Sequence, residues 1–417
     1  METRSIYIVA IFMGLSLASC QWSTEIETKE VLVGKPITMS LDELHASTAA
    51  LLPEPIQNSG KIYAYQNYIF INDLYRGIHV IDNTDPSNPE KIRFINIPGN
   101  VDLSIKDNFL YADCLRDLVV MDITDIHNIR LVTRLEGVLQ DNTPWPFEAD
   151  LVEYGDFDYQ NEVIVGWELV KEERKVDEIQ SRIDNIVTFD SFSESANGGG
   201  TGEGGSLARF KMVGDYLYIV DWHNINIVKI SNLEKPEVLE SVFAGFDIET
   251  IFNRGQHLFL GSRSGMYIYD ISTPEKPDFV SEFQHGTACD PVVVDDQYAY
   301  VTLRGGNDCG ATERGLYIID ISDLKKPFEV KSYAMEGPYG LGIKDNLIFI
   351  CDGEAGLKVY NKANVLDLKL VNHFADIQTY DVIPLNEHLL MVGDNHLYQY
   401  EYLDDHIQLL SSFSLLD

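Results

Sequence analysis

Apolar and polar residues alternate along most of this chain, in short runs that end at Asp, Asn, Gly or Pro. In "GLYIIDISDLKKPFEV", residues 315–330, the alternating β-branched and aromatic side chains predict a strand, and the polar "SDLKKP" predicts a turn before a second strand. Similar phrases occupy residues 77–92, 117–132 and 265–280. A phrase that recurs at a regular spacing indicates a repeat architecture.

Seven units of about 40 residues align around this phrase, each with four short strands and tight polar turns. They start at Lys61, Val101, Arg209, Glu249, Asp290, Tyr339 and Tyr380. One four-stranded sheet cannot cover both of its faces, whereas seven stacked in a ring bury them against one another. The sequence therefore predicts an all-β fold over residues 37–417: a seven-bladed β-propeller of four-stranded blades, with one long insertion at 138–205 between blades two and three.

The repeated phrase also resembles a known family. The segments "GIHVIDNTDPSNP", "DLVVMDIT", "MYIYDISTPEKP" and "LYIIDISDLKKP" are similar to the LVIVD-repeat family of bacterial propeller proteins. This resemblance implies the propeller fold and an exported or surface location. It supplies no catalytic motif, so no catalytic residue is assigned from it.

The first residues indicate export and lipid anchoring. The apolar run at residues 6–17 is too short to cross a bilayer and is typical of a signal peptide. It leads into "LASC", which resembles the lipobox of bacterial lipoproteins, so residues 1–20 are expected to be a signal peptide and Cys20 the lipidated residue. Residues 21–36 would form a polar tether. Because Gln21 is not Asp, we expect a bacterial cell-envelope protein at the outer membrane or cell surface.

The net charge and the absence of common catalytic motifs narrow the possible classes of function. The formal net charge of -35 excludes nucleic acid as a partner, because such a surface repels phosphate backbones. The sequence contains no H-E-x-x-H, G-x-S-x-G or C-x-x-C motif. A non-catalytic binding or scaffold module is therefore favoured, with a protein or a glycan as ligand.

Candidate ligand-binding residues follow from the geometry of a propeller blade. The first strand of each blade starts, and the second strand ends, on the same face, so side chains at these positions converge around one channel mouth. This reasoning selects Asp102, Arg209, Glu249, Asp290, Arg304, Tyr339, Asp381 and Trp222. Trp222 is the best of three candidates for stacking on a glycan, the others being Trp145 and Trp167.

Two interpretations of the carboxylates in this group remain open. Asp102, Glu249, Asp290 and Asp381 would need pairing, hydration or a bound cation such as Ca²⁺. Arginines at the same face, Arg209 among them, would supply the pairing in a structural ion-pair network. The alternative function is a propeller hydrolase or lactonase that uses these carboxylates with a bound cation.

Cysteine positions predict one disulfide bond. Cys289 precedes the first strand of unit five and Cys309 lies in a lengthened loop of the same unit, so both reach the same face. Cys114 and Cys351 close strands in units that are not neighbours. They are expected to be free, partly buried thiols.

Overall fold

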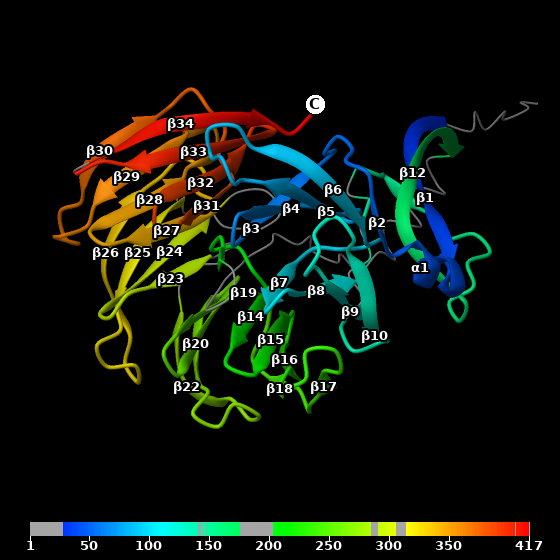
Figure 1. Cartoon of the computed structure of the whole chain (residues 1–417), viewed down its shortest axis with the longest axis horizontal. Coiled ribbons are helices and arrows are strands. Elements are labelled where there is room, and N and C mark those ends of the chain that lie inside the picture. The colour runs from blue at the N-terminus through cyan, green and yellow to red at the C-terminus, as the bar shows by residue number, and fades with distance from the viewer. Residues whose placement is uncertain are drawn as a thin grey trace, which may run out of the picture.

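The computed structural model describes residues 28–140, 143, 145–146, 148–175, 203–284, 291–305, 314–404 and 406–416. Its regular structure is almost entirely β, which confirms the predicted all-β class. Figure 1 shows sheets arranged around a common centre, with a smaller sheet outside them. None of the described helices is long and apolar enough to cross a membrane.

The main sheets, numbered 1 to 7 here, are each built from strands that are consecutive in the chain and antiparallel. Sheet 1 contains β3 (Ser59–Tyr65), β4 (Tyr68–Asp73), β5 (Gly77–Asp82) and β6 (Glu90–Asn96). Sheet 2 contains β7 (Leu103–Lys106), β8 (Phe109–Cys114), β9 (Asp117–Asp122) and β10 (Arg130–Leu135). Sheet 3 contains β14 (Phe210–Val213), β15 (Tyr216–Asp221) and β16 (Asn224–Lys229), with an outer strand split into β17 (Glu237–Val238) and β18 (Val242–Phe243).

The second half of the chain repeats this arrangement. Sheet 4 contains β19 (Ile248–Arg254), β20 (His257–Ser262), β21 (Gly265–Asp270) and β22 (Asp278–Gln284). Sheet 5 contains β23 (Val292–Val294), β24 (Tyr298–Arg304), β25 (Arg314–Asp320) and β26 (Phe328–Ala334). Sheet 6 contains β27 (Leu341–Lys344), β28 (Leu347–Cys351), the short 3₁₀-helix η2 (Gly353–Ala355), β29 (Leu357–Asn361) and β30 (Lys369–Phe374). Sheet 7 contains β31 (Asp381–Pro384), β32 (His388–Gly393), β33 (His396–Tyr402) and β34 (Ile407–Ser414).

The core lies between neighbouring sheets, because each sheet has apolar residues on both faces. Ile318 of sheet 5, for example, shares a buried cluster with Ile348 of sheet 6. Sheets 1 and 7 are joined in the same way, since Ile71 and Leu390 belong to one cluster. The innermost strands contact one another in the order β3, β7, β14, β19, β23, β27 and β31, and β31 contacts β3 in turn.

The repeated polar turn between the third and fourth strands has a local cause. The aspartate at the end of the third strand accepts a hydrogen bond from the backbone N–H two residues later, as Asp82 does from Thr84 at 2.8 Å and Asp320 from Ser322 at 2.8 Å. Hydrogen bonds from the Thr84 side chain and backbone hold the pKa of Asp82 below its usual value. This aspartate therefore sets turn geometry and is structural.

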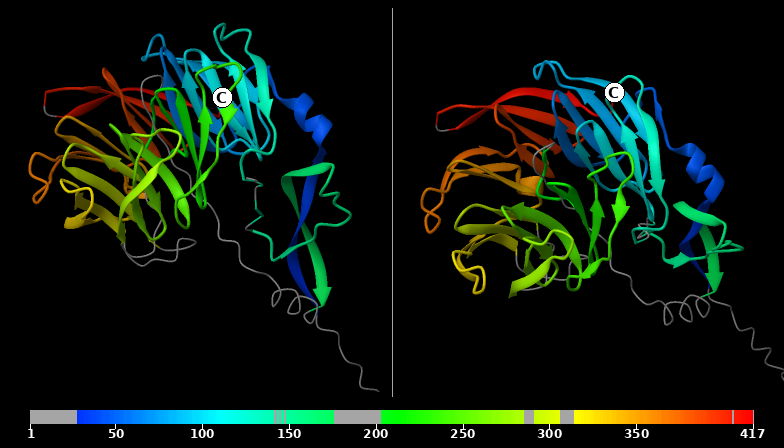
Figure 2. Two further views of the ribbon diagram at one scale, coloured as in Figure 1. Left: turned by 90° about the horizontal axis from the view of Figure 1, so that it is seen from below. Right: turned by 60° about the horizontal axis from the view of Figure 1, so that its bottom comes forward.

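A three-stranded sheet lies beside the ring (Figures 1 and 2). Its strands β1 (Thr28–Ser40) and β12 (Glu162–Lys175) pair antiparallel along nearly their whole length, and β11 (Leu151–Val152) pairs parallel with β1. We call this sheet the ribbon. The helix α1 (Leu41–Ser47) follows it, with a capping box between Ser40 and Glu43. β2 (Ala49–Leu51) then joins the outer edge of sheet 1 through β6.

The ribbon is built from the predicted tether and the predicted insertion. Residues 28–36, expected to be part of a polar tether, form most of β1. The insertion at 138–205 supplies β11, β12 and the short β13 (Glu203–Gly204), which pairs with the inner edge of β3. Two strands of the insertion, β11 and β12, thus pair with β1, which precedes the ring in the chain. The last strand of the insertion, β13, pairs with β3 in the ring.

Candidate functional site

The end of the insertion lies among the innermost strands. We call residues 203–208 the inner segment. After β13 pairs with β3, the Ser206 hydroxyl accepts a hydrogen bond from the Leu341 N–H at 2.7 Å, and the Ala208 carbonyl accepts one from the Ile251 N–H at 3.0 Å. These partners belong to sheets 1, 6 and 4. The chain itself therefore lies beside two of the predicted ligand-binding carboxylates, those of Asp102 and Asp381.

The Asp102 carboxylate binds backbone N–H groups directly after the inner segment. Its Oδ2 accepts hydrogen bonds from the backbone N–H of Arg209 at 2.6 Å and of Phe210 at 3.2 Å, at the start of β14. The same oxygen pairs with the Lys61 ammonium at 3.2 Å, and both side chains are buried. These contacts are structural, with Lys61 as the pairing cation where the sequence predicted an arginine.

Of the other three predicted carboxylates, the structure describes those of Asp381 and Glu249. Asp381 is fully buried, its Oδ1 accepts a hydrogen bond from the Val382 N–H at 2.9 Å, and its carboxylate lies against Gly205. Glu249 is also buried. Asp290 lies outside the described residues. Within the described ranges no group of three His, Cys, Asp or Glu side chains has the arrangement of a metal site.

Asp113, which the predicted site omitted, is a buried carboxyl group with a raised pKa. It is fully buried and accepts hydrogen bonds from the N–H groups of Val101 and Asp102 and from the Asn100 side-chain amide. Burial raises its pKa to about 6, although the Arg209 charge and the backbone hydrogen bonds act in the opposite direction. Only the assembled core could reveal this environment, because the sequence shows an ordinary strand-end aspartate.

Two predicted residues do meet at an accessible place. Arg304 ends β24 and Tyr339 precedes β27, and the guanidinium lies 4.1 Å from the centre of the tyrosine ring. Tyr380, which precedes β31, is 5.4 Å from Tyr339 between ring centres. All three are half-buried, on the face where the innermost strands start, which we call the upper face. We call Arg304, Tyr339 and Tyr380 the rim site.

Tyr380 was missed by the sequence reasoning, although a signal existed. Tyr339 and Tyr380 both open their units in the alignment, so the repeat itself places them at equivalent positions on adjacent sheets. The prediction took Asp381 from that unit instead, and Asp381 is buried beneath the rim.

Trp222 lies elsewhere on the upper face. It is half-buried and follows Asp221, whose carboxylate accepts the Asn224 N–H at 2.9 Å. Beside it, the His223 ring is 5.3 Å from Phe246, which is largely exposed. Trp222 is thus separated from the rim site along the ring, on sheet 3 rather than sheets 5 to 7.

The other two tryptophans lie outside the ring. Trp145 and Trp167 have their ring centres 5.9 Å apart, and Trp167 is 5.6 Å from Tyr154. Tyr154 and the neighbouring Phe157 line an open pocket of about 730 Å³ at the ribbon. The sequence gives no sign that Trp145 and Trp167 meet, because the ribbon forms through long-range pairing.

Of the cysteines for which the sequence made predictions, the structure describes Cys114 and Cys351. Cys20, Cys289 and Cys309 lie outside the described residues, so the lipidation and the disulfide bond stay predictions. Cys114 and Cys351 form no disulfide bond, as predicted, and both are fully buried rather than partly buried. Burial raises the pKa of the Cys114 thiol and of the Cys351 thiol.

Comparison with known families identifies the repeated phrase as a known repeat. The LVIVD repeat model matches residues 58–93, 99–135, 204–243 and 285–335. The chain carries LVIVD repeats. The matched segments correspond to sheets 1, 2, 3 and 5, so these repeats and the ring of four-stranded sheets together give an LVIVD-repeat β-propeller fold. No curated protein matches the chain.

Solved structures agree with this fold. The computationally designed Ika8 protein is 11% identical, with a TM-score of 0.52 over 86% of this chain and 90% of that chain. A protein from Lactobacillus plantarum is 10% identical, with a TM-score of 0.53 over 85% of this chain and 96% of that chain. At such low identity the likeness concerns the fold alone.

Proposed function

We propose that this LVIVD-repeat protein is a seven-bladed propeller that acts as a non-catalytic binding or scaffold module, held at the bacterial cell envelope by a lipid on Cys20. Its ligand, a protein or a glycan, binds at the rim site on the upper face. The contact between Arg304 and Tyr339 carries the proposal. A half-buried guanidinium over a tyrosine ring offers planar hydrogen-bond donors beside an aromatic face, a combination common in recognition surfaces.

The contacts between sheets support a count of seven blades. Each of the seven main sheets has one innermost strand, and those strands contact one another in a complete cycle from β3 to β31. The buried cluster shared by sheets 1 and 7 supports closure. The alternative function, a cation-dependent hydrolase, needs carboxylates that face a substrate, whereas Asp102 serves the backbone of the chain itself.

The rim site is tested by substitution. Arg304→Ala removes the donors and Tyr339→Ala removes the ring, and each should weaken binding at least about tenfold because the two groups act together. Binding is measured on an array of bacterial surface glycans and, separately, by crosslinking to envelope proteins from the producing cells. The matched control is Arg254→Ala, which removes an arginine at the opposite end of an innermost strand. Retained binding in both rim variants would exclude this site.

The anchor is tested independently. Cys20→Ala should abolish incorporation of labelled fatty acid and release the protein from the membrane fraction, because the thiol that carries the lipid is gone. Cys114→Ala is the control, since that thiol is buried in sheet 2. Equal labelling of Cys20→Ala and the parent protein would refute lipid anchoring and leave the rim-site proposal standing.

A further inference from the structure

The ribbon carries a continuous row of aromatic rings. Starting from Trp145 and Trp167, the row continues through Tyr154 to Tyr159, 6.4 Å away, and ends at Phe157, 4.5 Å from Tyr159. Most of these contacts are edge-to-face. Trp167 lies in β12, and Tyr154, Phe157 and Tyr159 lie between β11 and β12. None of the five belongs to the buried clusters of the seven main sheets.

Exposure of these rings to water is unfavourable unless a ligand covers them. Tyr159 is 70% exposed and Tyr154 is 38% exposed, although large aromatic side chains gain most by burial. A single exposed ring is ordinary, but a connected row beside a pocket is typical of a recognition surface. The row therefore points to a ligand with an apolar face.

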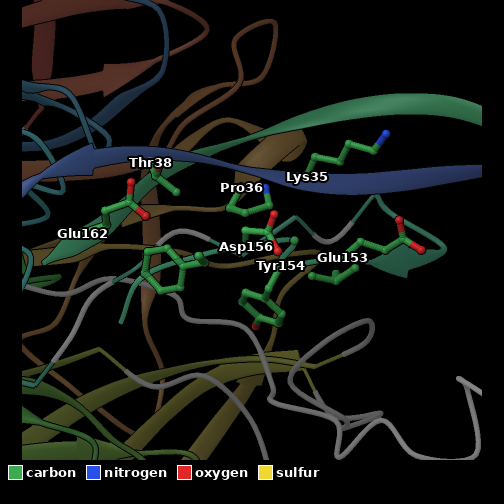
Figure 3. Close-up of a pocket in the computed structure, with 10 residues that line it drawn as sticks. Lys35, Pro36, Thr38, Glu153, Tyr154, Asp156 and Glu162 are labelled. Carbon is green, nitrogen blue, oxygen red and sulfur yellow. The ribbon is translucent and has the colours of Figure 1, made fainter. Parts of the chain in front are cut away.

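The pocket next to the row is polar and acidic. Glu153, Asp156 and Glu162 line it together with Pro36, Tyr154 and Phe157, and Figure 3 shows Glu162 and Glu153 on opposite sides of Pro36 and Asp156. Lys35, the one lining cation in the described residues, is bound to Glu172 at 2.6 Å. The pocket thus offers hydrogen-bond acceptors and repels anions.

Asp156 is the acceptor most available to a ligand. The Glu153 carboxylate accepts a hydrogen bond from Arg174 at 3.0 Å, and the Glu162 carboxylate accepts one from the Asp158 N–H at 3.0 Å. Asp156 is exposed and forms no hydrogen bond or ion pair with any other described residue. Its carboxylate is therefore open to hydroxyl donors.

We propose that the ribbon pocket binds an uncharged oligosaccharide, at a site separate from the rim site and independent of the proposed function. A sugar ring has a C–H face that packs on Tyr154 and hydroxyl donors that reach Asp156. The rings linked from Trp145 to Phe157 offer contacts to more than one sugar unit.

The test uses the full-length protein and defined probes. Hexamers of β-linked glucose, N-acetylglucosamine and α-linked mannose are titrated by calorimetry, with an anionic polygalacturonate oligomer and a hexalysine peptide as probes of the competing classes. We expect at least one uncharged hexamer to bind at millimolar concentration or below and to change the tryptophan fluorescence through Trp167. The two charged probes should not bind at the ribbon.

Substitutions separate this site from the rest of the molecule. Tyr154→Ala should weaken binding of that hexamer at least about tenfold, and Asp156→Asn should weaken it severalfold while leaving the melting temperature unchanged. Phe328→Ala, which removes an exposed ring on sheet 5, is the matched control and should bind as the parent protein does. Binding only of hexalysine, no binding of any uncharged hexamer, or full binding by a folded Tyr154→Ala variant would each overturn the proposal. Loss of binding in Arg304→Ala alone would implicate the rim site instead.

Discussion

At the scale of single residues, Asp113 shows how the ring interior changes ordinary chemistry. Its carboxyl group is withdrawn from water, and its pKa of about 6 exceeds the usual value of 3.8 because burial opposes ionisation. Between these two values the folded protein keeps a proton that the unfolded chain releases. This group therefore stabilises the fold less as the pH rises from about 4 to about 6.

The pH effect can be isolated with Asp113→Asn. The amide cannot ionise, so the free energy of unfolding of the parent protein minus that of the variant should decline as the pH rises from about 4 to about 6, at up to about 1.4 kcal/mol per pH unit. Above that range the difference should level off. Urea unfolding curves at a series of pH values measure it. A difference that stays constant with pH would show that Asp113 has an ordinary pKa in the fold.

At the scale of elements, the inner segment depends on one small residue. A Cβ added at Gly205 would collide with the carboxylate of Asp381, which is itself fully buried and has little room to move. The same carboxylate lies beside Gly340. The inner segment can therefore pass sheet 7 only because position 205 lacks a side chain.

Gly205→Ala should destabilise the protein by more than about 1 kcal/mol, because overpacking in a well-filled interior forces the neighbours apart. Thermal and urea unfolding measure the loss. The control is Gly337→Ala, at a position where an added Cβ meets nothing within 4 Å, and we expect it to change stability little. Similar behaviour of the two variants would mean that the inner segment does not pack tightly against Asp381.

At the scale of the whole molecule, the ring closes without a strand shared between its first and last sheets. Sheets 1 and 7 share no strand, and they meet through a buried apolar cluster. A reciprocal amide pair adds to this closure: Gln399 donates to the Asn83 oxygen at 2.6 Å, and Asn83 donates to the Gln399 oxygen at 3.0 Å. Both side chains are buried.

Breaking this pair from one side should cost about 1–3 kcal/mol, because Gln399→Leu leaves the buried Asn83 amide without its partner. The double variant Asn83→Leu with Gln399→Leu should recover part of that loss, since neither unpaired amide remains. A double-mutant cycle in urea, with Asn83→Leu as the fourth protein, measures the coupling free energy. A coupling of zero would show that this amide pair does not help to join the first and last sheets.

The sequence by itself determined the strands, their turns and the repeat. Alternation of side chains is a property of neighbouring residues, and an aspartate such as Asp82 bonds to a backbone group only two residues away. Stacked repeats then follow, because one four-stranded sheet cannot bury both of its faces. The positions of Arg304 and Tyr339 on one face were predictable for the same reason.

Only the tertiary structure decided what fills and what surrounds the ring. β1 pairs with β12 across more than a hundred residues, and β13 reaches β3 from the far end of the insertion. No local pattern encodes such pairings, because they depend on which distant edges the completed ring leaves open. The same long-range contacts bury Asp102 and Asp381 against the inner segment and gather the aromatic row on the ribbon.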